Sequence, residues 1–249
     1  MWEILLLCTA GFAAGALNAV AGGGTFLSLP ALIYVGVPPV AANATATLSA
    51  LPGYVGSGWA FRHDLRAEGR LGLRAVMQMA ALGSLAGAGL LLVTSDTVFS
   101  GLVPWLLVLA TALFALGPAF IAMIRKKGLP DAGPLLSALV ILAVSIYGGY
   151  FNGGLGIMLL AAFGLLGYVD LHNMNGLKNV LSALLSLVSA VTFVVAGLIA
   201  WQAALPLALA SALGGFIGAH YSRRITNTYY LRLFVIAVGA VMSVLFFLT

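Results

Sequence analysis

The sequence predicts an all-α, polytopic membrane protein made of two inverted-topology repeats of about five segments each, with glycine-broken half-helices. Three observations predict this fold: the composition, an internal repeat and the distribution of positive charge. Of the 249 residues, 62% are hydrophobic and 7% are charged, whereas soluble domains carry about 25% charged residues. So few charges cannot cover a water-facing surface. The apolar runs also reach the roughly 20 residues that a helical membrane span needs.

Ten apolar segments follow one another along the chain. Two of them, 25–36 and 155–169, are short for a crossing. We expect each to be a half-helix that forms a broken hairpin with the segment before it, and full crossings are the alternative. The first repeat would cover residues 1–127 and the second residues 128–249. The ten segments are 3–21, 25–36, 40–61, 73–93, 98–124, 134–151, 155–169, 174–200, 203–220 and 230–248.

The internal repeat is a pattern of glycine and asparagine inside very apolar sequence. Gly15, Asn18 and Gly22 have the spacing G-x2-N-x3-G, and the same spacing recurs 134 residues later. Interrupted hydrophobic segments at matching places in two halves indicate a transporter binding site. The second copy consists of Gly149, Asn152 and Gly156.

A second pair of glycine motifs also corresponds between the halves. Gly83-x3-Gly87 matches Gly214-x3-Gly218 at a shift of 131 residues. Small residues at this spacing are typical of close contacts between membrane helices. The contact would lie either inside one subunit or between two subunits of a homodimer.

Positive charge gathers in or beside three loops, at 62–74, 125–127 and 223–232, and of the eleven Lys and Arg residues only Lys178 stands apart. The positive-inside rule places these loops in the cytoplasm, and counting segments from them places both termini outside. Five is an odd number, so two similar five-segment halves would insert in opposite directions. Because the basic residues lie beside spans, the pI of about 9.6 does not indicate a nucleic-acid partner.

The glycine breaks are the predicted binding site. A helix that starts near Thr25 would direct its free N–H groups and the positive end of its dipole into a cavity, which favours an anion. A second helix start near Gly156 and Ile157 would do so from the other side. Close helix packing is the alternative reason for the glycines. The candidate substrate-binding residues are Asn18, Gly22, Gly23, Gly24, Thr25, Asn43, Thr45, Asn152, Gly156, Ile157, Lys178 and Asn179.

Lys178 lies within the span 174–200, and ionisable residues at membrane depth usually face a cavity. Its ammonium would attract an anion; alternatively, it reaches water along its own stem. Asp170 and His172 precede this span and are candidates for gating or proton coupling, or they belong to an ordinary polar loop.

Several classes of function lack support in the sequence. No two histidines are close and there is a single cysteine, so nothing indicates a metal site. P-loop, zincin and nucleophile-elbow spacings are absent, so we expect neither an enzyme nor a cofactor. The acidic residues all lie at segment ends or in loops, which argues against a cation transporter and for an anion transporter.

The stretch 22–32 (GGGTFLSLPAL), then Gly36-Val37-Pro38-Pro39 and Ala41 to Thr45, resembles the TauE/SafE sulfite exporter family, as does Asn175 to Asn179. The resemblance covers essentially the whole chain. It departs in the second copy, where Ile157 and Met158 stand opposite Gly23 and Gly24, and Gly164 stands opposite Pro30.

This resemblance implies a bacterial or archaeal inner-membrane transporter, commonly an exporter, for sulfite, sulfoacetate or related organosulfonates. The sequence therefore predicts a secondary transporter of small sulfur-containing anions that works by alternating access. Its partners would be the lipid bilayer, the anion and a coupled ion such as a proton. A passive anion channel and a carrier of another small carboxylate or oxyanion are the alternatives.

Overall fold

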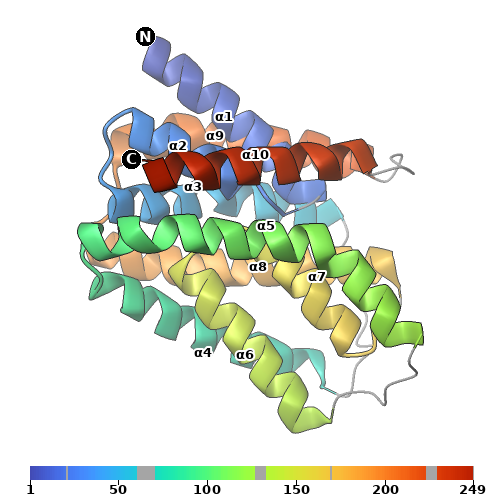
Figure 1. The fold of residues 1–249 in the computed structure, drawn as a ribbon. Helices are drawn as coiled ribbons and strands as arrows, with labels where there is room; N and C mark the ends of the chain where they lie inside the picture. The colour runs from blue at the N-terminus through green and yellow to red at the C-terminus, as the bar shows by residue number, and fades with distance from the viewer. Residues whose placement is uncertain (21, 61–70, 127–132, 169, 223–228, 249) are drawn as a thin grey trace.

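The structure is a computed structural model of residues 1–249, and it describes all of them except 21, 61–70, 127–132, 169, 223–228 and 249. The described part of the chain forms ten helices (Figure 1), which confirms the all-helical fold class. The helices are α1 (Trp2–Val20), α2 (Thr25–Tyr34), α3 (Pro39–Ala60), α4 (Leu73–Leu92), α5 (Asp96–Lys126), α6 (Pro134–Tyr150), α7 (Leu155–Leu165), α8 (Leu171–Val195), α9 (Trp201–Ser222) and α10 (Tyr229–Leu248).

Each helix corresponds to one predicted segment. The largest difference is at α8, which begins three residues before the predicted start at 174 and ends five residues before the predicted end at 200. The chain stops being helical there because Gly197 adopts a φ of +72°, which lies in the left-handed region that favours glycine.

Five of the described helices are long and apolar enough to cross a membrane, by length and composition. They are α1, α4, the first 18 residues of α5, α8 from Asn173, and α9. The helices α2 and α7 have only 10 and 11 residues, about half of the roughly 20 that a crossing needs. The two segments predicted to be short are therefore short helices.

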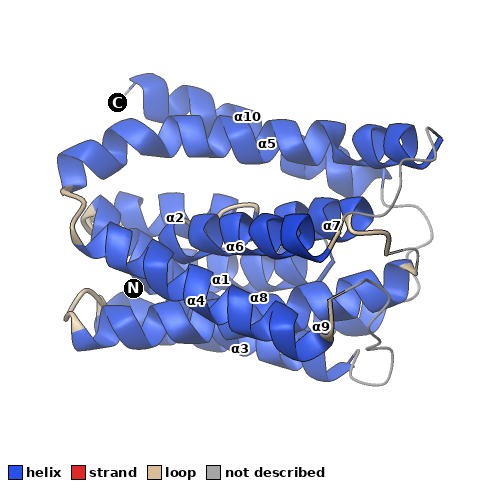
Figure 2. Ribbon diagram, turned by 90° about the horizontal axis from the view of Figure 1, so that it is seen from below, coloured by secondary structure: helices blue, strands red, loops and turns tan. Residues whose placement is uncertain are grey.

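The helices run roughly alongside one another and form layers. Figure 2 shows α5 and α10 together in one layer, beside the rest of the bundle. The rings of Trp105 on α5 and Phe247 on α10 pack edge to face, with centroids 5.1 Å apart. The short helices α2 and α7 contact this layer, so α5 and α10 cover the two half-helices.

Glycine-rich crossings hold the bundle together. A β-carbon added to Gly15 on α1 would lie 2.8 Å from the amide nitrogen of Gly215 on α9. One added to Gly149 on α6 would lie 2.8 Å from Cα of Ser84 on α4. At both crossings the backbones therefore approach so closely that only glycine fits.

The two predicted glycine motifs make such contacts inside the chain. A β-carbon on Gly83 would lie 2.6 Å from Cβ of Ser145, and one on Gly214 would lie 3.0 Å from Cα of Phe12. Of the two locations that the sequence left open, the structure shows the contact inside one subunit.

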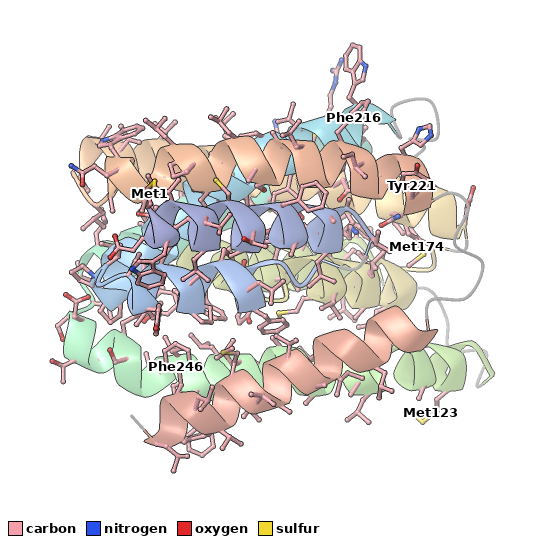
Figure 3. All side chains as sticks on the ribbon, turned by 90° about the horizontal axis from the view of Figure 1, so that it is seen from above. Met1, Met123, Met174, Phe216, Tyr221 and Phe246 are labelled. Atoms are coloured by element: carbon pink, nitrogen blue, oxygen red, sulfur yellow. The ribbon has the colours of Figure 1, made fainter. Side chains whose placement is uncertain are left out.

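Apart from the ends at the two glycine breaks, labelled residues near helix ends lie toward opposite ends of the bundle. Figure 3 labels Met123, Met174 and Tyr221 toward one end and Met1 toward the other. The loop residues Arg62, Arg66, Arg70, Lys127, Arg223 and Arg224 lie outside the described residues. Arg74, in the first turn of α4, is exposed.

Candidate functional site

Two helical hairpins are broken where the sequence predicts. The first break separates Val20 at the end of α1 from Thr25 at the start of α2, and the second separates Tyr150 from Leu155. Gly22 has a φ of +86° and Gly154 a φ of +73°, and side-chain-bearing residues rarely adopt such angles. The glycines are therefore what allows the chain to turn between the two helices of each hairpin.

The two breaks meet inside the molecule, where Gly22 and Gly156 are both buried. A β-carbon added to Gly22 would lie 2.6 Å from Cα of Gly156, and one added to Gly156 would lie 2.7 Å from Cα of Gly22. We call these two contacting breaks, residues 22–24 and 152–156, the hairpin tips. The backbones of residues that lie 134 apart in sequence thus touch, and any side chain at either glycine would push the tips apart.

Lys178 lies directly against the tips. Its side chain is fully buried (0% exposed), and its Nζ donates hydrogen bonds to the carbonyl oxygens of Asn18 at 3.3 Å and Ala19 at 3.5 Å. These carbonyls belong to the last turn of α1, where helix C-termini leave oxygens unpaired and the dipole favours a cation. The ammonium group is buried at this helix end and does not extend along its stem to water.

Asn18 stabilises the first tip through its side chain. Its Oδ1 accepts a hydrogen bond from the N–H of Gly24 at 2.7 Å, just before α2 begins. The side-chain oxygen thus holds the glycine turn, and the donation to an anion that the sequence predicts would come from Nδ2 of the same amide.

Asn152 makes different contacts from its counterpart in the repeat. Its Nδ2 donates to Oγ of Ser186 on α8 at 3.0 Å, and its Oδ1 accepts from the Tyr54 hydroxyl at 3.5 Å. The sequence did not point to Tyr54 or Ser186. Ser186 belongs to a row of polar residues at helical spacing on α8, which could have indicated it, whereas Tyr54 has no such signal.

The remaining predicted residues lie at different distances from the tips. Thr25 and Ile157 are buried in the first turns of α2 and α7, and Gly23 precedes α2. Asn179 is fully buried beside Lys178, and neither polar atom of its side chain has a partner among the described residues. Asn43 donates from Nδ2 to the carbonyl of Tyr150 at 2.8 Å, next to the second tip.

Three predicted residues are not brought to the tips by a described contact. Thr45 accepts a hydrogen bond at Oγ1 from the N–H of Ala200 at 3.0 Å, so it ties α3 to the connection before α9. Asp170 is exposed just before α8, and its carbonyl accepts from the N–H of Met174 at 2.9 Å. His172 lies in the first turn of α8, and its side chain is outside the described residues.

The described polar groups around the tips are amides, hydroxyls and one ammonium group. Within the described residues, no three His, Cys, Asp or Glu side chains come close enough to hold a metal ion. Two helix N-termini and Lys178 give this interior a positive potential, which suits an anionic ligand.

A bundle of apolar helices with broken hairpins and a polar interior defines a multi-pass membrane protein. Residues 7–246 match the family described as "Sulfite exporter TauE/SafE". The chain belongs to this family.

Similar proteins carry the same kind of name. A "Probable membrane transporter protein" of Haemophilus influenzae is 30% identical over 86% of this chain and 83% of its own. "Probable membrane transporter protein ORF9" of Sinorhizobium sp is 28% identical (88% and 83% covered), and "Probable membrane transporter protein YfcA" of Escherichia coli is 27% identical (92% and 84%). No solved structure matches. The family and these relatives are transporters, which implies a non-enzymatic role.

Proposed function

We propose that this protein is a secondary transporter that exports small sulfur-containing anions, such as sulfite or organosulfonates, across the inner membrane by alternating access. The observation that carries the proposal is the contact between Gly22 and Gly156 beside the buried Lys178. The substrate would bind where the tips separate. There, Lys178 would supply charge, while Asn18, Asn152 and Asn179 would donate hydrogen bonds.

The charge at the tips supports an anion as the substrate. The helices α2 and α7 both begin at a tip, so the positive ends of their dipoles point toward the crossing. Lys178 adds a positive charge when it is protonated, and it is held by carbonyl oxygens that are weaker partners than an anionic oxygen. An arriving anion would therefore compete for the ammonium group.

The packing supports two inverted repeats, residues 1–127 and 128–249. The contact of Gly15 with Gly215 has a counterpart in the contact of Gly149 with Ser84 at the shifts of 134 and 131 residues that the sequence gives. Gly22 and Gly156 correspond to each other, so their contact would lie on the two-fold axis that relates the halves. Such an axis places the binding site near the bilayer midplane.

The proposal also includes an orientation of the bundle in the membrane. The end of the bundle near Met123 and Tyr221 would face the cytoplasm, because the Lys- and Arg-rich loops flank it. Both chain termini would lie outside. A proton gradient would drive export, with Asp170 and His172 at the cytoplasmic start of α8 as the groups that couple it.

A carrier fits the tips better than a passive channel does. The backbones of Gly22 and Gly156 are in contact, so an ion passing the crossing would require the halves to move apart. A channel needs a continuous path in one conformation, whereas alternating access needs a closed crossing between two states.

Counterflow in proteoliposomes tests the proposal. Vesicles preloaded with unlabelled sulfite and diluted into trace labelled sulfite should accumulate the label above its external concentration, since a carrier exchanges one anion for another. Flux that never rises above equilibrium would indicate a channel. Absence of flux for sulfite, sulfoacetate and taurine, with flux for another oxyanion or a carboxylate, would contradict the substrate class.

A further inference from the structure

Helix α8 carries a buried polar stripe. Its members recur at intervals of four, three, four and three residues, and at 3.6 residues per turn they and Lys178 share about 100° of the helix circumference. Four of the five are at most 1% exposed, and the first is half-buried. The stripe consists of Asn175, Asn179, Ser182, Ser186 and Ser189.

The two halves of this stripe differ in their hydrogen bonding. Ser186 accepts from Asn152 at 3.0 Å, and the hydroxyl of Ser189 lies 2.8 Å from that of Ser84 on α4. In the first half, Oδ1 of Asn175, both amide atoms of Asn179 and Oγ of Ser182 have no partner among the described residues. These are four of eight such buried atoms, and the other four are scattered singly over α3, α5, α6 and α9.

Buried polar atoms almost always find a partner in protein or in water. A row of unpartnered amides and hydroxyls on one helix face is therefore where water or a hydrated solute would supply the missing bonds. At 1.5 Å per residue, the row from Asn175 to Ser182 is about 10 Å long. It starts near the first turn of α8 and reaches the level of Lys178 and the tips.

Aromatic rings pack beside the second tip. The rings of Phe99, Tyr147, Tyr150 and Phe151 form a cluster there, with centroids 5.8 to 6.3 Å apart. The Tyr147 hydroxyl also donates to the carbonyl of Gly153 at 2.7 Å, which fastens the cluster to the second tip. Phe99 and Phe151 are fully buried.

The two halves of the repeat carry different residues at the positions of the aromatic cluster and of the polar stripe. At a shift of 134, Tyr147, Tyr150 and Phe151 correspond to small or aliphatic residues, and Asn175 and Ser182 also correspond to apolar ones. The aromatic residues beside the second tip, and Asn175 and Ser182, thus have no like counterpart in the other half, whereas Asn179 corresponds to the polar Thr45. The counterparts are Ala13, Ala16 and Leu17 for the aromatic residues, and Ala41 and Leu48 for the polar ones.

We infer that Asn175, Asn179 and Ser182 line a hydrated access route for a small anion, which runs from the end of the bundle where α8 begins to the hairpin tips, and that the aromatic cluster closes the other side. This inference rests on the proposed function for the identity of the solute. With the proposed orientation, the route leads to the cytoplasm.

Two serines on the same helix face provide a matched test. In a Cys8→Ala background, Ser182→Cys and Ser189→Cys each replace a hydroxyl by a thiol of similar size. The probe is the membrane-impermeant anion MTSES, applied to inside-out vesicles. Ser182→Cys should react about tenfold or more faster than Ser189→Cys, because only the thiolate of a hydrated cysteine reacts.

Two further variants calibrate the measurement. Gly133→Cys lies at an exposed position with open space around it and should react fully. Leu181→Cys replaces a fully buried apolar residue of α8 and should react no faster than Ser189→Cys. Equal rates for Ser182→Cys and Ser189→Cys, with Gly133→Cys reactive, would overturn the route, and so would a faster reaction at Ser189→Cys.

Sulfoacetate separates failure of the route from failure of the proposed function. Slower labelling of Ser182→Cys in sulfoacetate would support both. Rapid labelling without protection and without counterflow of any sulfur anion would leave the route standing and contradict the proposed substrate. Slow labelling of Ser182→Cys together with normal sulfite counterflow would reject the route alone.

Discussion

At the scale of single residues, the burial of the Lys178 ammonium group needs a physical explanation. A fully buried ammonium group is costly unless it is paired, and the carbonyls of Asn18 and Ala19 are its described partners. Two roles must therefore be separated: the stabilisation of the end of α1, and the proposed binding of the anion.

The substitution Lys178→Met separates the two roles, because methionine keeps most of the side-chain length and removes the charge. Losing a hydrogen bond to a charged group costs about 1.5–3 kcal/mol, so sulfite affinity should fall roughly 10- to 100-fold. The measurement is the rise in melting temperature with added sulfite, which reports binding to the folded state.

Lys178→Arg is the control, since it keeps the charge and should retain part of the sulfite-dependent rise. If Lys178→Met lowers the melting temperature of the free protein and yet keeps the full sulfite effect, the lysine only stabilises α1 and does not bind the substrate.

The contact between Gly22 and Gly156 gives a second residue-scale prediction. In Gly156→Ala, the new methyl group would lie 2.7 Å from Cα of Gly22, and backbone cannot rotate away as a side chain can. Such overpacking costs about 1–3 kcal/mol. We expect a lower melting temperature and slower counterflow.

Gly101→Ala on α5 is the matched control, because nothing lies within 4 Å of the position of its methyl group. It should transport like the wild type. Wild-type counterflow by Gly156→Ala would show that the tips need not touch during the cycle.

At the scale of the helices, stability depends on close backbone approach. In lipid there is no hydrophobic drive between helices, so small residues and van der Waals contact hold them together. Two glycines of α4 illustrate this: Gly87 packs against α6, where its β-carbon would lie 2.7 Å from the amide nitrogen of Tyr150, whereas Gly89 faces open space.

Gly87→Leu should therefore prevent α4 from packing on α6, while Gly89→Leu should be tolerated. Size-exclusion chromatography of the solubilised proteins measures this, with aggregated or degraded Gly87→Leu and a single peak for Gly89→Leu as the expected result. A single symmetrical peak for both variants would indicate that α4 and α6 do not depend on this contact.

At the scale of the whole molecule, the orientation of the two halves decides where each tip lies. Ser95, between α4 and α5, and Gly133, before α6, are both exposed. The long helix α5, which separates them, has 31 residues and a length of about 46 Å, more than the roughly 30 Å of the hydrocarbon core. The two positions should therefore lie on opposite faces of the membrane.

Ser95→Cys and Gly133→Cys in the Cys8→Ala background test this orientation. In intact cells, an impermeant maleimide should label Ser95→Cys alone, and both should react after the membrane is permeabilised. Labelling of both variants in intact cells would remove the inverted arrangement of the halves, and the binding site at their axis with it.

Much of the architecture was predictable because the bilayer acts on local sequence. Backbone in lipid must satisfy its own hydrogen bonds, as a helix does within one apolar run, so apolar runs predicted all ten helices, and the run of glycines from Gly22 to Gly24 predicted the start of α2 at Thr25. The family was predictable from the residues around the same break, as the match over residues 7–246 confirms.

Within the site, only residues that are unusual in the sequence pattern could be predicted. Lys178 was noticeable because a charge inside an apolar segment is unusual, and Asn152 because it repeats Asn18. Tyr54 was not, because a tyrosine in a membrane helix is common at the interface and only packing brings its hydroxyl to Asn152. Thr45 was a candidate for substrate binding from its sequence, and only the structure shows that its hydroxyl accepts from the N–H of Ala200.

The sequence alone therefore determined the helical class, the ten segments and the two glycine breaks, since hydrophobic length and the freedom of glycine act within a few residues of the chain. Only the tertiary structure decided that Gly22 touches Gly156, that Lys178 binds carbonyls 159 and 160 residues away, and that aromatic rings cluster beside the second tip while α8 carries unpartnered buried polar groups. These features depend on how distant helices pack, and that packing is set by the summed contacts of the whole bundle, which no short stretch of sequence contains.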